Sequence, residues 1–130
     1  MYYMEQLPNI NAIREVEFPL IDEAFIEALA GKIVAAFSPR RVILFGSRAR
    51  GDYRPESDVD LFIEMDTNEP RWKRRWQVDD LFPRRWWPMD LYIMNPAEVR
   101  QSLLSSMSIL PDIEREGKVL YDELHHSSRS

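Results

Sequence analysis

The sequence predicts a single α/β (α+β) domain in which helices flank a small mixed β-sheet. Its 130 residues are 45% hydrophobic, which is enough for one compact core. Short apolar runs rich in β-favouring residues alternate with segments whose apolar residues recur at helical spacing. Such an alternation of strands and helices is typical of a sheet covered by helices.

The first helix is expected from Asp22, since apolar residues between Ile21 and Phe37 fall on one helical face and Pro39 ends the pattern. A later helix start is well marked at Asn95, which is followed by a proline suited to the first turn and by a glutamate able to reach back to the cap. Strands are expected over 41–46, 59–65 and 89–94, helices over 69–82, 95–106 and 111–116, and a short helix and loop over 48–57. The segment 119–121 is apolar enough to pack on the domain.

Three segments divide the chain. Residues 1–20 show little periodicity and predict a loosely held lead-in, residues 21–122 form the domain, and residues 123–130 predict a flexible tail. His125 and His126 belong to that tail in this interpretation and are not metal ligands.

Composition excludes several classes of function. The chain has no cysteine, so it has no disulfide, thiolate metal site or cysteine nucleophile. Its first five residues lack the basic start and apolar core of a signal peptide, and no apolar run is long enough for a membrane span. We therefore expect a soluble, cytoplasmic protein. The net charge of −5 argues against direct, sequence-independent binding of long nucleic acid.

Two aspartates stand out in the second apolar run. Asp58 and Asp60 are two residues apart, so in a strand they project from the same face. A pair of surface acids is the alternative, but acids are depleted from strands and these are flanked by buried-type residues. Together they predict a Mg²⁺ site, with two ions about 3.5–4 Å apart as in other two-metal sites. One ion would bind a triphosphate and the other an attacking hydroxyl.

The first apolar run ends in Gly46-Ser47, a pair that suits phosphate binding. Glycine permits close backbone approach, the amides that enter the next helix meet phosphate oxygens, and Ser47 adds a hydroxyl donor. Arg48 and Arg50 flank this loop and are candidates for clamping the triphosphate or the departing pyrophosphate. A solvated helix face is an equal alternative for both arginines.

Asp90 lies in the third apolar run and completes a triad of acids if its strand neighbours the second one. It would then serve as metal ligand and as general base toward the acceptor hydroxyl. The alternative is an edge-strand acid or a turn cap after Pro88.

Residues 71–87 contain all four tryptophans and six of the seventeen basic residues. Three interpretations stay open: packing on the sheet, a protein interface, and contact with nucleic acid, the last disfavoured by the acidic total. In the packing interpretation Trp72, Trp76, Val78 and Leu81 line one helix face, with basic residues on the other.

These motifs resemble the minimal nucleotidyltransferases of the DNA polymerase β-like nucleotidyltransferase superfamily. The family pattern is Gly-Ser, a spacer, Asp-x-Asp and a third acid on a later strand. Gly46, Ser47, Asp58 and Asp60 match it, and Asp90 fits the third position. The resemblance implies the nucleotidyltransferase fold.

The surrounding residues resemble the prokaryotic members in particular. The stretch Gly46-Ser47-Arg48-Ala49-Arg50-Gly51 and the stretch Ser57-Asp58-Val59-Asp60-Leu61 are similar to theirs, which places Ser57 among the nucleotide-binding residues. The resemblance runs from the first helix to about Leu120.

This family implies Mg²⁺-dependent transfer of AMP from ATP to a hydroxyl, with release of pyrophosphate. Many short prokaryotic members are similar to antitoxins that adenylylate a tyrosine of a HEPN-domain toxin ribonuclease, so the resemblance implies such a toxin as partner. The short chain fits this, because the surface of the acceptor would complete the site. Two alternatives stay open: a small-molecule (aminoglycoside-type) nucleotidyltransferase completed by dimerisation, and a non-catalytic antitoxin that acts by binding.

Overall fold

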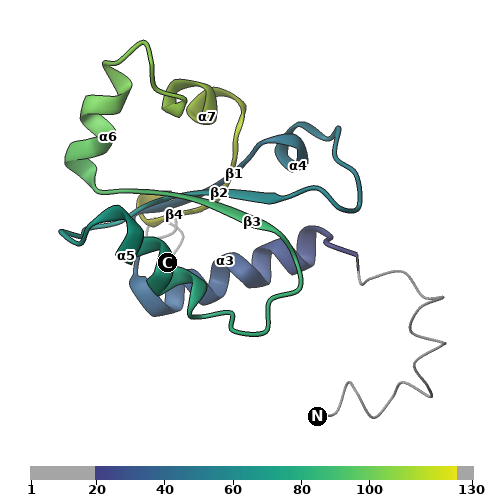
Figure 1. Cartoon of the computed structure of the whole chain (residues 1–130). Coiled ribbons are helices and arrows are strands. Elements are labelled where there is room, and N and C mark those ends of the chain that lie inside the picture. The colour runs from purple at the N-terminus through teal and green to yellow at the C-terminus, as the bar shows by residue number, and fades with distance from the viewer. Residues whose placement is uncertain (1–19, 126–130) are drawn as a thin grey trace, which may run out of the picture.

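The structure, a computed structural model, describes residues 20–125, whose four strands form one mixed sheet between two layers of helices (Figure 1). The elements are α3 (Glu23–Phe37), β1 (Arg41–Phe45), α4 (Ser47–Arg50), β2 (Val59–Glu64), α5 (Arg71–Asp79), β3 (Met89–Met94), α6 (Pro96–Leu103), α7 (Leu110–Glu116) and β4 (Lys118–Asp122). The strand order is β3-β2-β1-β4, with β1 antiparallel to both neighbours and β2 parallel to β3. The predicted fold class is confirmed.

The helix starts follow the capping signals in the sequence. The carboxylate of Asp22 accepts the Phe25 N–H at 2.8 Å and caps α3, which ends where Ser38 takes a left-handed conformation. At the start of α6, Asn95 and Glu98 form the predicted reciprocal capping box.

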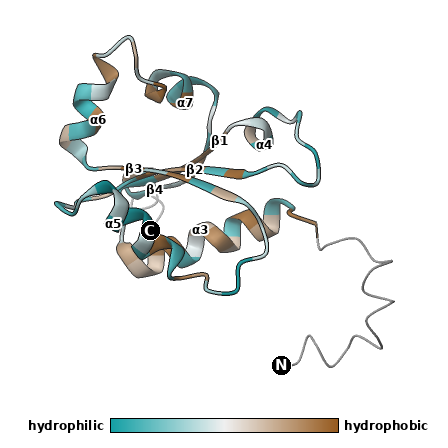
Figure 2. Cartoon of the chain, viewed as in Figure 1, coloured by the Kyte–Doolittle hydropathy of each residue, from teal (hydrophilic) through white to brown (hydrophobic). Residues whose placement is uncertain are grey.

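The two faces of the sheet carry separate hydrophobic clusters. Helices α3 and α5 cover one face, and α6 and α7 lie on the other (Figure 1), while Ala49 of the short helix α4 packs against the cluster on the α3 side. Along β1, Val42 and Leu44 pack in the cluster on the α3 side, while Ile43 packs with Phe62 and the α6–α7 residues on the opposite side. Hydrophobic residues are accordingly concentrated in the strands and along α3 (Figure 2). Between residues 20 and 125, no helix has the length and apolar character needed to cross a membrane.

The sequence did not predict strand β4, but only that residues 119–121 pack on the domain. Strand β4 pairs antiparallel with β1, and the register shifts between Val42 and Ile43. Because β4 is half-exposed and Val119 faces solvent, its residues lack the alternation that would have predicted a strand.

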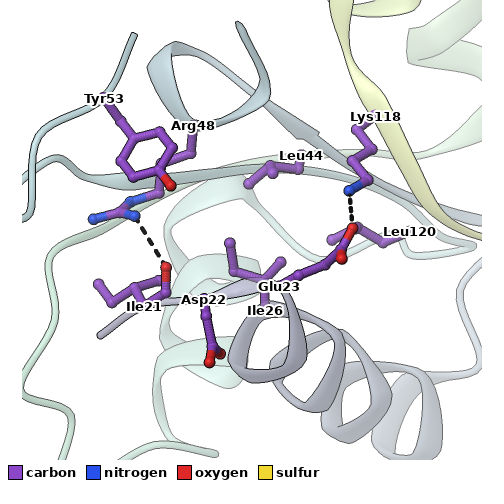
Figure 3. Close-up of a pocket in the computed structure, with 9 residues that line it drawn as sticks. All are labelled: Ile21, Asp22, Glu23, Ile26, Leu44, Arg48, Tyr53, Lys118 and Leu120. Atoms are coloured by element: carbon purple, nitrogen blue, oxygen red, sulfur yellow. Dashed lines mark hydrogen bonds and ion pairs between the residues drawn. The ribbon is translucent and has the colours of Figure 1, made fainter. Parts of the chain in front are cut away.

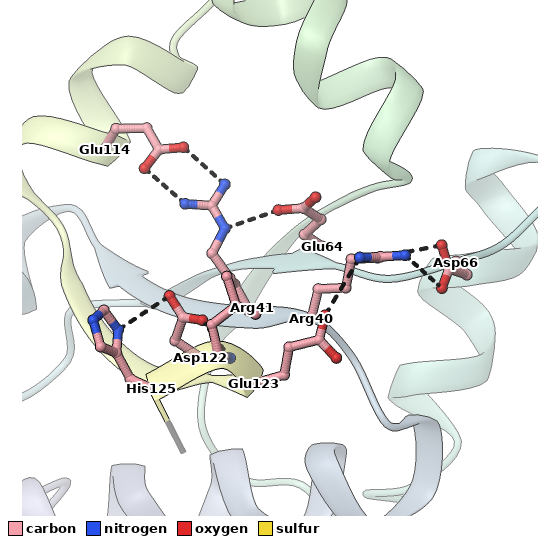
Figure 4. A network of polar contacts seen from close by, with 9 residues as sticks. Arg40, Arg41, Glu64, Asp66, Glu114, Asp122, Glu123 and His125 are labelled. Atoms are coloured by element: carbon pink, nitrogen blue, oxygen red, sulfur yellow. Dashed lines mark hydrogen bonds and ion pairs between the residues drawn. The ribbon is translucent and has the colours of Figure 1, made fainter. Parts of the chain in front are cut away.

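Two arginines at the start of β1 tie this strand to its neighbours (Figure 4). The Arg41 Nε donates to Glu64 Oε1 at 2.8 Å, and its terminal nitrogens bond both carboxylate oxygens of Glu114 at 2.7 Å. These bonds raise the pKa of Arg41 and keep its half-buried guanidinium charged, and the bonds to Glu114 have the largest effect. The same network includes Arg40, Asp66 and Glu123.

Helix α5 presents a different face to the core from the one predicted. Trp72 and Trp76 are 70% and 60% exposed, whereas Arg74 and Val78 are buried. The packing prediction is therefore wrong for these tryptophans and confirmed for Val78. The reason is that the Arg74 guanidinium bonds both oxygens of Glu98, at 2.7 and 3.2 Å, and also two backbone carbonyls. A tryptophan at this position could not satisfy those acceptors.

The other two tryptophans do pack on the domain. Trp87 is buried in the α3-side cluster, with its ring 5.0 Å from that of Phe25 and 5.7 Å from that of Phe82. Trp86 covers the same aromatic group from outside at 5.5 Å from Trp87. Only part of the Trp/Arg segment therefore serves the core.

The predicted lead-in and tail fall mainly outside the described residues, which exclude 1–19 and 126–130 and hence His126. Of the expected tail, the Glu123 N–H donates to the Arg40 carbonyl at 2.9 Å, and His125 Nδ1 lies 3.6 Å from Asp122.

Candidate functional site

The predicted acids come together on one face of the sheet. Asp60, the second residue of β2, pairs in register with Asp90 on β3 and with Phe45 on β1. Because the residues on either side of Asp60 belong to the α3-side cluster, Asp60 projects to the face on which α6 and α7 lie. Asp58 precedes β2 by one residue and is exposed.

The carboxylate of Asp60 is destabilised in its ionised form. Burial raises its pKa, and the negative charges of Asp58 and Asp90 raise it further, while the charge of Arg50 lowers it. Asp58 and Asp90 are thus both close enough to Asp60 to repel its partly buried carboxylate. An added cation would relieve this repulsion.

Gly46 brings the backbone of the next turn against Asp60. Its φ is +75°, and a Cβ built on it would lie 2.1 Å from Asp60 Oδ2, so only glycine fits. The first helical hydrogen bonds of α4 run from the N–H groups of Ala49 and Arg50 to the Gly46 carbonyl. The N–H group of Ser47 therefore precedes the first N–H group that donates within the helix, and it directly follows Gly46, which contacts Asp60.

Arg48 is buried, which excludes the solvated helix face considered for it. Its guanidinium donates to carbonyl oxygens at 3.1–3.3 Å and lies 4.8 Å from the Tyr53 ring centroid. The acceptors are the carbonyls of Ile21, Arg54, Pro55 and Ser57. Arg48 thereby holds the loop that leads to Asp58, a role that sequence reasoning missed because its partners are backbone atoms. Figure 3 shows its bond to Ile21 beneath Tyr53.

The remaining predicted residues lie around the same loop. Arg50 is exposed, stands 3.5 Å from Asp52 and acts electrostatically on Asp60. The Ser57 hydroxyl accepts the Arg54 N–H at 2.8 Å, so it closes the loop before Asp58. For Arg48, Arg50 and Ser57, direct contact with a nucleotide stays a prediction.

Arg75 of α5 is a neighbour of the site that the sequence did not single out. Its guanidinium lies 3.6 Å from Asp90 Oδ1 and donates to the Leu91 carbonyl at 3.1 Å. The Asp90 side chain is 42% exposed and remains accessible beside this arginine. The position of α5 along β3 explains the contact, and that position depends on the tertiary structure.

The donor set fits a hard cation such as Mg²⁺. It consists of carboxylates, the ligands that Mg²⁺ prefers, and it includes no histidine or cysteine. Within residues 20–125, no three acidic or histidine side chains are already close enough together to form a metal site. Mg²⁺ needs only one or two carboxylates, because waters and substrate phosphates supply the rest. The raised pKa of Asp60 and its packing on Gly46 support this fit.

Two hollows lie near the site, on opposite faces of the sheet. A cavity of about 160 Å³ is lined by Leu44 and Leu120 on the α3 side, away from the acids (Figure 3). An open groove of about 460 Å³ lies between β3 and the α6–α7 connection. Tyr92, which is two residues from Asp90 on the same strand, lines this groove. The groove therefore lies on the same face of the sheet as Asp90.

Comparisons with known proteins agree with this geometry. The sequence model of the nucleotidyltransferase domain family matches residues 26–115. A Methanocaldococcus jannaschii protein named "Putative protein adenylyltransferase MJ0604" is 46% identical over 44 residues, which cover 34% of this chain and 42% of that protein. The matched segment is thus less than half of that relative.

Two solved structures match part of the chain. A crystal structure of a toxin-antitoxin with AMP-PNP has a TM-score of 0.51 at 21% identity, covering 74% of this chain and 73% of that one. A Sulfolobus solfataricus structure described as a putative nucleotidyltransferase has a TM-score of 0.48 at 23% identity, covering 58% and 68%.

Proposed function

Because the chain belongs to the nucleotidyltransferase domain family, we propose that it transfers AMP from ATP to a hydroxyl group of a partner protein. The observation that carries this proposal is the register of Asp60 with Asp90, beside Gly46 and within electrostatic range of Asp58. The relative named as an adenylyltransferase of proteins supports the protein acceptor.

In this proposal the acceptor oxygen attacks the α-phosphorus of ATP. A new oxygen–phosphorus bond forms, the bond from the α-phosphorus to the oxygen bridging it to the β-phosphate breaks, and pyrophosphate leaves. Asp90 accepts the hydroxyl proton, since its side chain is accessible at the edge of the sheet. The N–H and hydroxyl of Ser47 bind phosphate oxygens, and Arg50 offsets their charge.

Asp58, Asp60 and Asp90 would hold the Mg²⁺ ions. When bound there, Mg²⁺ would neutralise the triphosphate and lower the pKa of the attacking hydroxyl. The raised pKa of Asp60 supports this assignment, because a nearby cation stabilises the charge that burial and its neighbours disfavour.

We further propose that the acceptor is a tyrosine of a HEPN-domain toxin and that the transfer silences it. The similarity in fold to a toxin-antitoxin structure with AMP-PNP supports a partner protein and a bound nucleotide. Arg48 supports the transfer indirectly, since its four carbonyl bonds hold the loop before Asp58 in place.

The test is label transfer from ATP labelled at the α-phosphate, with Mg²⁺ and lysate of the host. Asp58→Asn and Asp60→Asn should each lower transfer to a protein band by at least about 100-fold while retaining the fold. Asp112→Asn is the matched control, because Asp112 is an exposed acid on α7 that pairs with the neighbouring Arg115 and lies outside the site. Full transfer by either site variant would rule out the proposed site, and a label found only on small molecules would favour a small-molecule acceptor.

A further inference from the structure

Helix α5 carries an exposed aromatic face, formed by Trp72 and Trp76 with Arg75 beside them. The two tryptophans are four residues apart and therefore adjacent on the helix surface, opposite Arg74 and Val78, which face the domain. At 70% and 60% exposure they leave roughly 300 Å² of aromatic surface in water. Patches of that size on a monomer are commonly functional.

This aromatic face adjoins the acids. Helix α5 lies along the free edge of β3, where Arg74 and Arg75 donate to the outward carbonyls of Ile93 and Leu91. Arg75, next to Trp76 in the chain, also reaches Asp90 at 3.6 Å. A molecule that covers the aromatic face therefore lies beside the opening of the site.

The charges around this face indicate what covers it. In residues 71–87, six basic residues accompany two acidic ones, while the whole chain has a net charge of −5. Of the six, Lys73, Arg74, Arg75 and Arg85 already pair with carboxylates of this chain. Among the described residues this leaves Arg84 and Arg71 outside ion pairs, although the charge of Arg71 also acts on Glu98. Two such arginines are few for nucleic acid, which binds through many phosphate contacts.

A second copy of the chain fits the face poorly, because a two-fold contact would bring the same cations together. An acidic protein surface fits better, since its apolar centre would cover the tryptophans and its carboxylates would pair with the surrounding arginines. Tryptophan and arginine are also the residues that most often dominate the binding energy of protein interfaces.

We propose that the aromatic face of α5 docks the acceptor protein through an acidic surface of that protein. This inference rests on the proposed transfer to a protein hydroxyl and adds where the acceptor binds. The face holds the acceptor, while Asp60 and Asp90 act on its hydroxyl.

The test compares two pairs of exposed apolar residues. Trp72→Ala/Trp76→Ala removes the aromatic face. Val119→Ala/Leu124→Ala removes a matched pair that is 55% and 76% exposed, on and just after β4, at the opposite edge of the sheet from β3. The acceptor is the host protein that wild type labels from α-labelled ATP, identified by mass spectrometry and then purified. We measure label transfer against acceptor concentration, binding of AMP-PNP, and retention of a single-stranded RNA by gel shift.

The tryptophan variant should raise KM for the acceptor at least tenfold, with kcat and AMP-PNP affinity within about twofold of wild type. Arg71→Glu should raise KM as well, most strongly at low salt. The valine–leucine variant should match wild type.

Each other outcome overturns the inference in a recognisable way. An unchanged KM in the tryptophan variant excludes this docking face but leaves protein adenylylation intact. A raised KM only in the valine–leucine variant moves the docking site to the β4 edge of the sheet. RNA binding lost in the tryptophan variant, with unchanged KM, assigns the face to nucleic acid. Absence of any protein label from wild type refutes the proposed function itself, and the docking inference with it.

Discussion

Substitution of Gly46 by alanine tests how the transfer rate depends on the position of the Asp60 side chain. The new Cβ would lie 2.1 Å from Asp60 Oδ2 and 3.1 Å from its Cγ. The backbone of Asp60 is held between β1 and β3, so its side chain has to move by about 1 Å to restore an ordinary contact. A displacement of about 1 Å in a catalytic group costs roughly 100-fold in rate.

The same substitution also strains the backbone. Gly46 has φ +75° and ψ −159°, a region that essentially only glycine adopts, so alanine should lower the free energy of unfolding by about 1–3 kcal/mol. Gly51→Ala is the matched control at the other end of α4, since its φ is +96° but no atom lies within 4 Å of a new Cβ. It should lose a similar amount of stability while keeping its transfer rate.

The assay is the initial rate of label transfer from α-labelled ATP, combined with urea unfolding of each variant. A Gly46→Ala variant that transfers at the wild-type rate would refute the close contact between Gly46 and the Asp60 carboxylate, or the role proposed for that carboxylate. A Gly51→Ala variant that loses as much activity as Gly46→Ala would show that backbone strain alone, and not the displaced Asp60, explains the loss.

Three further predictions concern stability. Asp60→Asn should raise the free energy of unfolding at about pH 7, because folding raises the pKa of Asp60 and its ionised form therefore destabilises the folded state. Wild type gains stability as the pH falls through that raised pKa. In urea titrations the difference in unfolding free energy between variant and wild type should therefore close near pH 4. Arg74→Lys should lose about 2–4 kcal/mol by the same measurement, since lysine cannot bond both oxygens of Glu98 and the edge of β3 together; wild-type stability would contradict this. Arg41→Ala should lose about 2 kcal/mol with nucleotide binding unchanged, whereas Arg115→Ala, whose ion pairs are exposed, should lose much less; equal losses would show that the Arg41 network adds nothing.

Much of the fold could be predicted because its signals are local. The caps at Asp22 and Asn95 and the apolar periodicity between them depend on residues within a few positions of one another. The proximity of Asp60 and Asp90 could also be predicted, since each lies near the start of its strand and the two acids come together if those strands are neighbours in the sheet. Their catalytic roles stay predictions.

What the sequence did not reveal depends on contacts between distant residues. The burial of Arg74 in place of Trp72 follows from its ion pair with Glu98, which lies in another element. Arg48 likewise points inward, because it donates to the carbonyl of Ile21, just before α3, and to the carbonyl of Pro55 in the loop after α4. Hydrophobicity alone ranks arginine below tryptophan for burial, so apolar periodicity could not predict that Arg74 or Arg48 is buried.

The place of β4 in the sheet has a consequence for how the chain folds during synthesis. Its partner β1 is made long before it, as the pairing of Leu44 with Lys118 shows, whereas β2 follows β1 after a short loop and β3 soon joins β2. The strands β1, β2 and β3, which position Gly46, Asp60 and Asp90, are thus available to pair while β1 still has an open edge. We expect the site to assemble early and the closure of that edge, a contact of high sequence separation, to be the slow step.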